Sequence, residues 1–178
     1  MRRLLKEVYR AYDSRLRANP LPVKMVTSGA VVCASDAVVQ VYTSPEGASF
    51  SLTRTLIIGV GYGALWFAPI LHGMTTMWSR VLPFMSITSL VTKSVVDMTT
   101  SFPVNVSAML AAQAYVRGEN DIKGAIERNI FASVTDGWLF WTPMSLIMYS
   151  MVPLRYRVAF LNAGSFGWNG WLAYRFKA

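Results

Sequence analysis

Four ionisable side chains, at Asp36, Lys93, Asp97 and Asp136, lie within long apolar stretches of this 178-residue chain. A charge at the depth of a bilayer core is costly, so such groups usually face a bundle interior or a wet cavity. Lys93 and Asp97 are four residues apart, which places them on one helix face where they can pair. Two interpretations stay open: these groups only cross-link helices, or they form a polar seam through which small solutes pass. The seam would comprise Asp36, Gln40, Lys93, Asp97 and Asp136, with Asn105 and Gln113 beside them.

Catalytic and metal chemistry have few candidates, because the chain holds one Cys and one His. Cys33 has no partner for a disulfide and lies among apolar residues, so we expect an inert packing residue. His72 has no identifiable nucleophile or orienting acid at motif level, and a helix-end or packing role is expected for it. We therefore expect no enzymatic activity, no metal site and no cofactor.

Small residues recur at a spacing that favours close helix packing. Gly59 and Gly63 form a GxxxG pair inside an apolar stretch, a pattern that lets two helix backbones approach closely. The same segment lacks the lysine and the downstream acid of a nucleotide-binding loop. Gly164 and Gly167 are interpreted in the same way as packing residues.

The elements that must position these groups are membrane-spanning helices. Of the residues, 53% are hydrophobic and 15% are charged, and mean hydropathy is +0.36, which excludes a disordered chain. About 20 mostly apolar residues span a bilayer as a helix, and no strand-like alternation is present. We expect an all-α, polytopic transmembrane helix bundle with about four spans. The expected spans are 21–42, 53–77, 88–116 (long, and so tilted or extended) and 129–151. A C-terminal helix at 156–176 contains several polar residues and is expected to pack in or on the bundle. The alternative is that this helix also crosses the membrane, which would give five full spans.

The net charge of +8 lies at the two ends of the chain, because residues 20–136 hold seven basic and seven acidic side chains. Basic flanks around a neutral apolar body are typical of a membrane protein rather than a nucleic-acid binder. Residues 2–18 are predicted to form an amphipathic helix for an anionic interface, ended by Asn19-Pro20. Glu7 and Asp13 count against a mitochondrial transit peptide. We expect one membrane domain over residues 1–178: an interfacial helix at 1–19 and a bundle at 20–178, with membrane lipids at the basic ends and no nucleic acid as partner.

The order of motifs resembles the peroxisomal membrane protein 22 kDa family, which includes the Mpv-seventeen and Sym-one type proteins. The resemblance runs nearly end to end, and its C-terminal Trp-Asn motif is the specific part. It rests on Asn19, Pro20, Asp36, Gln40, Arg54, Gly63, Pro69, His72, Lys93, Asp97, Pro103, Trp138, Trp141, Pro153, Arg157, Trp168 and Asn169. The resemblance implies a non-enzymatic four-span protein of peroxisomes or the mitochondrial inner membrane. It further implies a weakly selective small-solute channel linked to metabolite balance and membrane homeostasis.

The sequence also departs from the family pattern at several positions. Ser35, Met74, Met98, Ser145, Met148 and Ala173 stand where the family has Gly, Trp, Gln, Gln, Asn and Ser. Several of these changes replace polar by apolar side chains, which would make a pore conduct less readily. Two hypotheses follow: a channel-like protein of the mitochondrial inner membrane, or a structural accessory subunit of a larger respiratory or ATP-synthase assembly. The basic amphipathic start favours the mitochondrial inner membrane over the peroxisomal membrane, and the protein is expected to form a homo-oligomer or join a larger complex.

Overall fold

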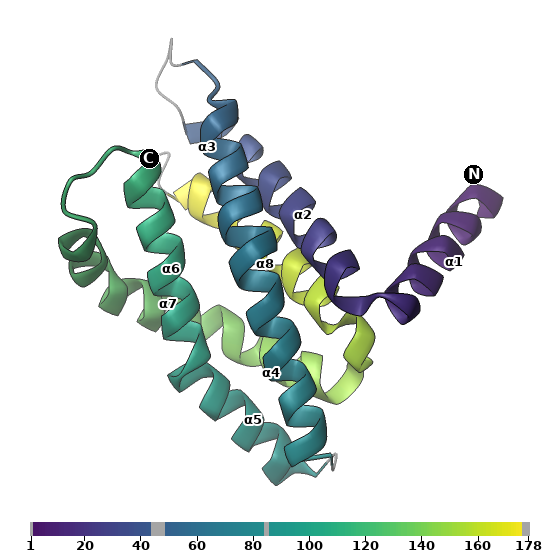
Figure 1. Cartoon of the computed structure of the whole chain (residues 1–178). Helices are drawn as coiled ribbons and strands as arrows, with labels where there is room; N and C mark the ends of the chain where they lie inside the picture. The colour runs from purple at the N-terminus through teal and green to yellow at the C-terminus, as the bar shows by residue number, and fades with distance from the viewer. Residues whose placement is uncertain (1, 44–48, 84–85, 176–178) are drawn as a thin grey trace.

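The structure, a computed structural model, describes residues 2–43, 49–83 and 86–175, and within these ranges it contains helices and no strand (Figure 1). The side chains at 2, 5, 43 and 169–175 are outside this description, so Asn169 is placed only by its backbone. The helices are α1 (Arg2–Ala18), α2 (Pro20–Thr43), α3 (Leu52–Leu56), the π-helix η1 (Ile57–Phe67), α4 (Ala68–Val81), α5 (Ile87–Thr99), α6 (Ser101–Val116), α7 (Ile122–Met151), the 3₁₀ turn η2 (Leu154–Tyr156) and α8 (Arg157–Arg175). The expected all-α class is confirmed.

Among the described residues, two helices are long and apolar enough to cross a membrane: Pro20–Tyr42, and the continuous helix Leu52–Val81 formed by α3, η1 and α4. Large apolar side chains face outward around the bundle; Leu139 is 86% exposed and Phe131 is 79% exposed. Outward-facing apolar residues of this size are expected where lipid tails cover the surface. The expectation of about four crossings stays a prediction.

The expected single span over residues 88–116 is wrong in one respect, because the chain forms two helices that meet at Thr100. Pro103 has no N–H to donate to the carbonyl of Thr99, and its ring crowds that carbonyl, so the helix is interrupted just before it. The hydroxyls of Thr99 and Thr100 also bond back to the carbonyls of Val95 and Val96 at 2.8 and 2.6 Å, which competes with regular helix geometry. The break lets α5 and α6 take different directions along the bundle (Figure 1).

The glycines of η1 allow it to pack tightly against α2. A Cβ built on Gly59 would lie 2.0 Å from Cys33 Sγ, and one on Gly63 would lie 2.9 Å from Val32 Cβ. A Cβ on Gly164 in α8 would meet the side chain of Met144 at 2.8 Å. Gly167 differs: it is exposed, with nothing within 4 Å of its Cβ position, so the close packing expected there is wrong.

The C-terminal helix α8 packs mainly along α2 and only lightly against α7, the helix it follows in the chain. Tyr149 and Met148 of α7, Trp78 of α4 and Leu161 of α8 form a buried apolar cluster where these helices meet. A hydrogen bond of 2.8 Å from Asn162 to Ser28 joins α8 to α2 in the interior.

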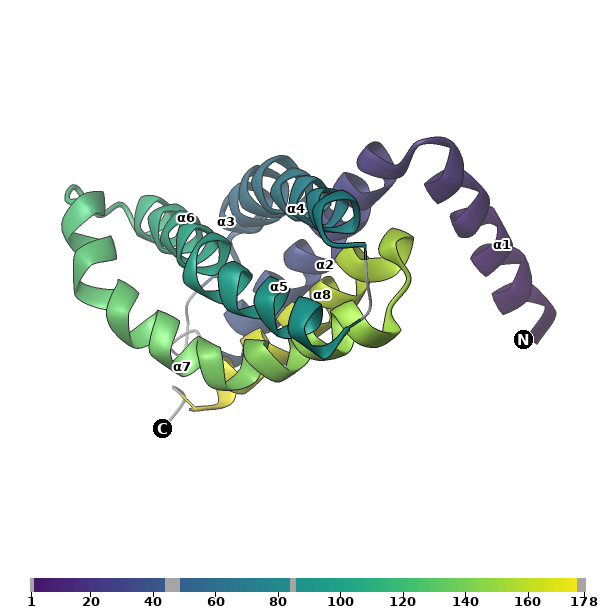
Figure 2. The same cartoon turned by 90° about the horizontal axis from the view of Figure 1, so that it is seen from below.

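The amphipathic helix α1 projects away from the bundle (Figures 1 and 2). Its last turn is anchored by Leu16, which is 1% exposed, whereas Leu4 is 65% exposed and Val8 is 59% exposed. Asn19 separates α1 from α2, as the sequence predicts.

A polar cluster ties α1 to the turn between α7 and α8. Arg17 donates to Asp13 Oδ2 from Nε and Nη2 at 2.9 and 2.6 Å, and the Tyr156 hydroxyl donates to Asp13 Oδ1. Arg155 Nε lies 3.5 Å from Asp13 Oδ1, and the hydroxyls of Tyr9 and Tyr156 are 2.8 Å apart. The hydrogen bonds from Tyr156 and Arg17 hold the pKa of Asp13 below its ordinary value. The same bond to Asp13 raises the pKa of Tyr156.

Candidate functional site: a cavity with polar stripes

The first two predicted seam residues, Asp36 and Gln40, close a polar clasp between α2 and α3. Asp36 accepts hydrogen bonds from Gln40 Nε2 at 2.7 Å, Thr55 Oγ1 at 2.8 Å and Arg54 Nε at 3.1 Å. Gln40 Oε1 accepts from the backbone N–H of Ser51 at 2.8 Å. Asp36 and Gln40 are buried, so the clasp cross-links helices, and of its members Arg54 also lines the cavity described below.

The pairing expected between Lys93 and Asp97 is wrong. The carboxylate of Asp97 accepts from Trp78 Nε1 at 2.7 Å and from the hydroxyl of Tyr149. Lys93 instead places its ammonium 5.7 Å from the centroid of the Tyr149 ring. The four-residue spacing does put both side chains on one face of α5, but α4 and α7 present neutral donors that take both carboxylate oxygens.

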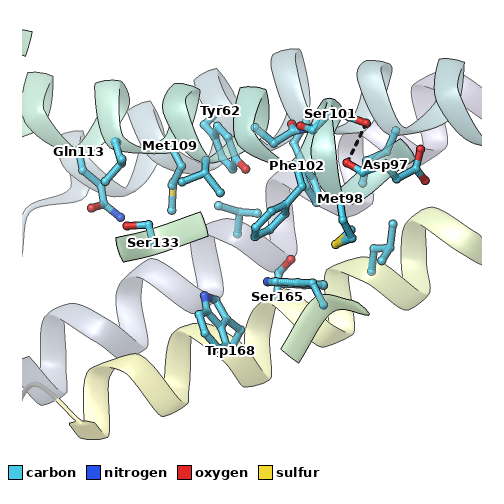
Figure 3. A pocket seen from close by; sticks show the side chains of 18 of the residues that line it. Tyr62, Asp97, Met98, Ser101, Phe102, Met109, Gln113, Ser133, Ser165 and Trp168 are labelled. Atoms are coloured by element: carbon cyan, nitrogen blue, oxygen red, sulfur yellow. Dashed lines mark hydrogen bonds between the residues drawn. The ribbon is translucent and has the colours of Figure 1, made fainter. Parts of the chain in front are cut away.

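A cavity of about 620 Å³ lies between these helices, with walls from α2, η1, α4, α5, α6, α7 and α8 (Figure 3). This volume falls within the range of small-molecule sites, roughly 300–1,000 Å³. Asp97 and Asp136 line the cavity, whereas Asp36, Gln40 and Lys93 do not. The structure therefore separates the predicted seam into a closed clasp, a buried cation and two cavity-lining acids.

Polar side chains line the cavity in two stripes, one from α5–α6 and one from α7. Members of the first stripe are spaced by four residues, with one interruption at Met109, so that each lies one turn from the next along the helix surface. In Figure 3 Gln113 of α6 points toward Ser133 of α7. The first stripe comprises Asp97, Ser101, Asn105, Gln113 and Arg117, and the second comprises Asn129, Ser133 and Asp136.

Asn105 is the member of the stripe with a buried side-chain atom that lacks a hydrogen-bond partner among the described residues. Its Nδ2 donates to the carbonyl of Ser101 at 2.8 Å, and the residue is 6% exposed. Its Oδ1 is buried and has no partner among the described residues. A buried acceptor without a partner is costly to the folded state.

The remaining wall of the cavity is rich in methionine and aromatic side chains, with Arg54, Thr75, Ser145 and Ser165 among them. Phe102, Trp141 and Trp168 contribute to it, and Phe102 and Trp168 are seen in Figure 3. Four of the six positions where the sequence departs from the family pattern also lie on this wall: Met74, Met98, Ser145 and Met148. Residues that differ from the family pattern therefore line the same cavity from three helices, α4, α5 and α7.

The other predicted motif residues act mainly between helices. His72 lies inside α4, two turns before its end, and its Nδ1 is 2.9 Å from Lys24 Nζ. Trp138 of α7 donates to the carbonyl of Met98 at 3.0 Å. The guanidinium of Arg157 stacks over the Tyr149 ring at 5.0 Å. Pro20 opens α2, Pro69 lies in the first turn of α4, and Pro153 precedes η2.

Sequence reasoning named Asp97, Asp136, Asn105 and Gln113 but missed the rest of both stripes. For the α6 side the signal was available, because polar residues recur at 97, 101, 105, 113 and 117 with Met109 at the one interrupted step. On α7 the pattern is less distinct, because Asn129, Ser133 and Asp136 form a shorter series that is interspersed with other polar residues. Only the folded structure shows that these three residues line the cavity.

The sequence of this chain is similar to proteins of one known family. A model of the Mpv17 / PMP22 family matches residues 114–173. The chain is 28% identical over 170 residues to Protein sym-1 of Neurospora crassa, which covers 92% of this chain and 95% of that protein. It is 23% identical over 171 residues to the mitochondrial inner membrane protein Mpv17 of Xenopus laevis, covering 94% and 96%. The corresponding protein of Bos taurus is 21% identical over 170 residues, covering 94% and 97%. No solved structure matches the chain.

Proposed function

We propose that this chain, whose residues 114–173 match the Mpv17 / PMP22 family model and whose relatives include mitochondrial inner membrane proteins, belongs to that family, lies in that membrane and passes small solutes through the cavity between α6 and α7. In this proposal the protein is non-enzymatic and channel-like. The carrying observation is the stripe of polar residues from α5 and α6 that lines the cavity.

The amide side chain of Asn105 supports the proposal, because it contributes a polar group to the cavity wall midway along the stripe. Both carboxylate oxygens of Asp97 already accept hydrogen bonds from Trp78 and Tyr149. We therefore expect Asp97 to bind a passing solute only weakly. The methionine and aromatic side chains on the opposite wall offer no fixed charge. These features favour weak selectivity and modest conductance.

The test is solute flux into liposomes that contain the purified full chain. Asn105→Leu keeps the side-chain volume and removes the hydrogen-bonding groups, and we expect flux of polar solutes to fall about tenfold, the effect of losing about one hydrogen bond. Thr135→Leu is the matched control, because Thr135 is exposed on α7, outside the cavity lining, and bonds only to its own helix. Equal flux in both variants, or no flux in the unmodified protein, would contradict the proposal.

The accessory-subunit alternative predicts the opposite pair of results. An accessory protein would be inert in liposomes and would migrate with a much larger assembly on a native gel after mild detergent extraction. Migration as a small oligomer together with measurable flux would support the channel proposal.

A further inference from the structure

Three buried cations gather between α2, α5 and α8 without an acidic partner. Lys24 and Lys93 are each 3% exposed and Arg157 is 8% exposed. In the part of the chain that the structure describes, none of the three forms an ion pair. Buried charges in proteins are ordinarily paired or bound to an ion, because an uncompensated one is strongly destabilising.

Tyr149 brings two of the three cations together, and Lys24 lies on the helix that packs along α8. Lys93 Nζ and the Arg157 guanidinium lie 5.7 and 5.0 Å from the centroid of the same Tyr149 ring. Lys24 belongs to α2, the helix along which α8 packs, and Arg157 opens α8. Lys24 in turn contacts His72 Nδ1 at 2.9 Å, so a fourth nitrogen group borders the cluster.

The protein groups around the cluster do not neutralise it. Asp97 is the acid joined to the same Tyr149, and its two oxygens accept from Trp78 and Tyr149. Among the described residues Asp97 forms no ion pair with any of the three cations, and the Arg157 guanidinium cannot lose its proton in a protein. Arg157 Nε is bound to the carbonyl of Val152 at 3.1 Å, which leaves its other N–H groups for a ligand.

We propose that Lys24, Lys93 and Arg157 bind the phosphate group of an anionic ligand. A phosphate carries the charge that the cluster lacks, and its oxygens suit ammonium and guanidinium donors. The site lies near the start of its helices: Lys24 is four residues into α2, Lys93 is six residues into α5, and Arg157 opens α8. At 1.5 Å per residue, each cation lies within about 9 Å of its helix start along the axis. That depth is compatible with a free phosphate from the aqueous side and with a phospholipid headgroup, and the experiment separates these sources.

The test measures thermal unfolding of the purified full chain in a neutral detergent, with and without inorganic phosphate. The second arm uses nanodiscs of phosphatidylcholine alone or with phosphatidic acid, whose phosphate is terminal. At a hundredfold excess over Kd, a bound ligand is expected to raise Tm by roughly 5–10 °C. A rise with phosphate assigns the site to a free anion, and a rise only with phosphatidic acid assigns it to a lipid headgroup; either supports the proposal.

Lys93→Gln and Lys24→Gln should each abolish most of this rise, whereas Lys93→Arg should keep it. Lys123→Gln is the control, because Lys123 is an exposed lysine on α7 whose side chain is 86% accessible. Binding of radiolabelled phosphate by equilibrium dialysis repeats the comparison if a Gln variant has a shifted Tm of its own. The proposal is overturned if neither probe raises Tm in the unmodified chain, or if the Gln variants respond as fully as Lys123→Gln.

Discussion

The close approach of η1 to α2 gives a prediction with an internal control on the same helix. A methyl group at Gly59 would lie 2.0 Å from Cys33 Sγ and 3.0 Å from its backbone N, whereas one at Gly61 would meet nothing within 4 Å. Non-bonded carbon atoms normally stay about 3.5–4.0 Å apart, so Gly59→Ala requires both a new Cys33 rotamer and a backbone shift. Such overpacking costs about 1–3 kcal/mol.

The helix-propensity gain from Gly to Ala, at most about 1 kcal/mol, applies to both variants and cancels when they are compared. For a chain of 178 residues, 1 kcal/mol corresponds to about 2–4 °C in Tm. Gly59→Ala should therefore unfold roughly 2–12 °C below Gly61→Ala, measured as loss of the helical circular dichroism signal in detergent.

A third variant tests whether Cys33 Sγ is the atom that destabilises Gly59→Ala. Adding Cys33→Ala to Gly59→Ala removes Sγ and should restore part of the lost Tm, while the contact with the Cys33 backbone keeps the rescue incomplete. Equal Tm values for the Gly59 and Gly61 variants would refute the reasoning. So would a Gly61 variant that is the less stable of the two.

Three further predictions concern other parts of the molecule. Asp36→Asn should lower the free energy of unfolding by about 1–3 kcal/mol, because an amide replaces a buried acceptor that holds three donors; Glu127→Gln, on an exposed ion pair, should leave it nearly unchanged. Met98→Gln should raise the liposome flux of polar solutes about tenfold by adding a hydrogen-bonding group to the apolar wall; an unchanged flux would remove this wall from the proposed path. Docking of α1 through Asp13 should be constant above about pH 4 and weaken as pH falls through its depressed pKa, because the folded state binds that proton less tightly than the unfolded chain, whose ordinary value is 3.8. Spin-label distances between α1 and the α7–α8 turn measure this, and Asp13→Asn should give the undocked distance at neutral pH.

The sequence predicts those features that depend on local chemistry. The break at Asn19-Pro20 and the cap of α7 by Asp121, which accepts from Gly124 N–H at 2.8 Å, follow from proline geometry and N-cap preference. The all-α class follows from the long apolar stretches. Gly59 is predictable as a packing residue, because a GxxxG pair indicates that two helix backbones lie close together even when the partner helix is not known.

Features that depend on which helix lies opposite are not predictable in this way. Lys93 and Asp97 have the spacing of a pair, yet Tyr149, 52 residues from Asp97 along the chain, decides both of their contacts. Gly167 repeats the glycine spacing of Gly164 but lies on the exposed side of α8. The polar cavity is visible in sequence only as a four-residue period, because its second wall comes from α7.

The clasp at Asp36 also bears on how the chain enters the membrane during its biosynthesis. Asp36 and Arg54 are 18 residues apart, and each would be an isolated charge if α2 and the following helix were inserted one after the other. Inserted together as a hairpin, the two helices bring a neutralised pair into the lipid, with Gln40 and Thr55 completing its hydrogen bonds. The first two membrane helices of this protein are therefore expected to integrate as one unit, ahead of the helices that complete the cavity.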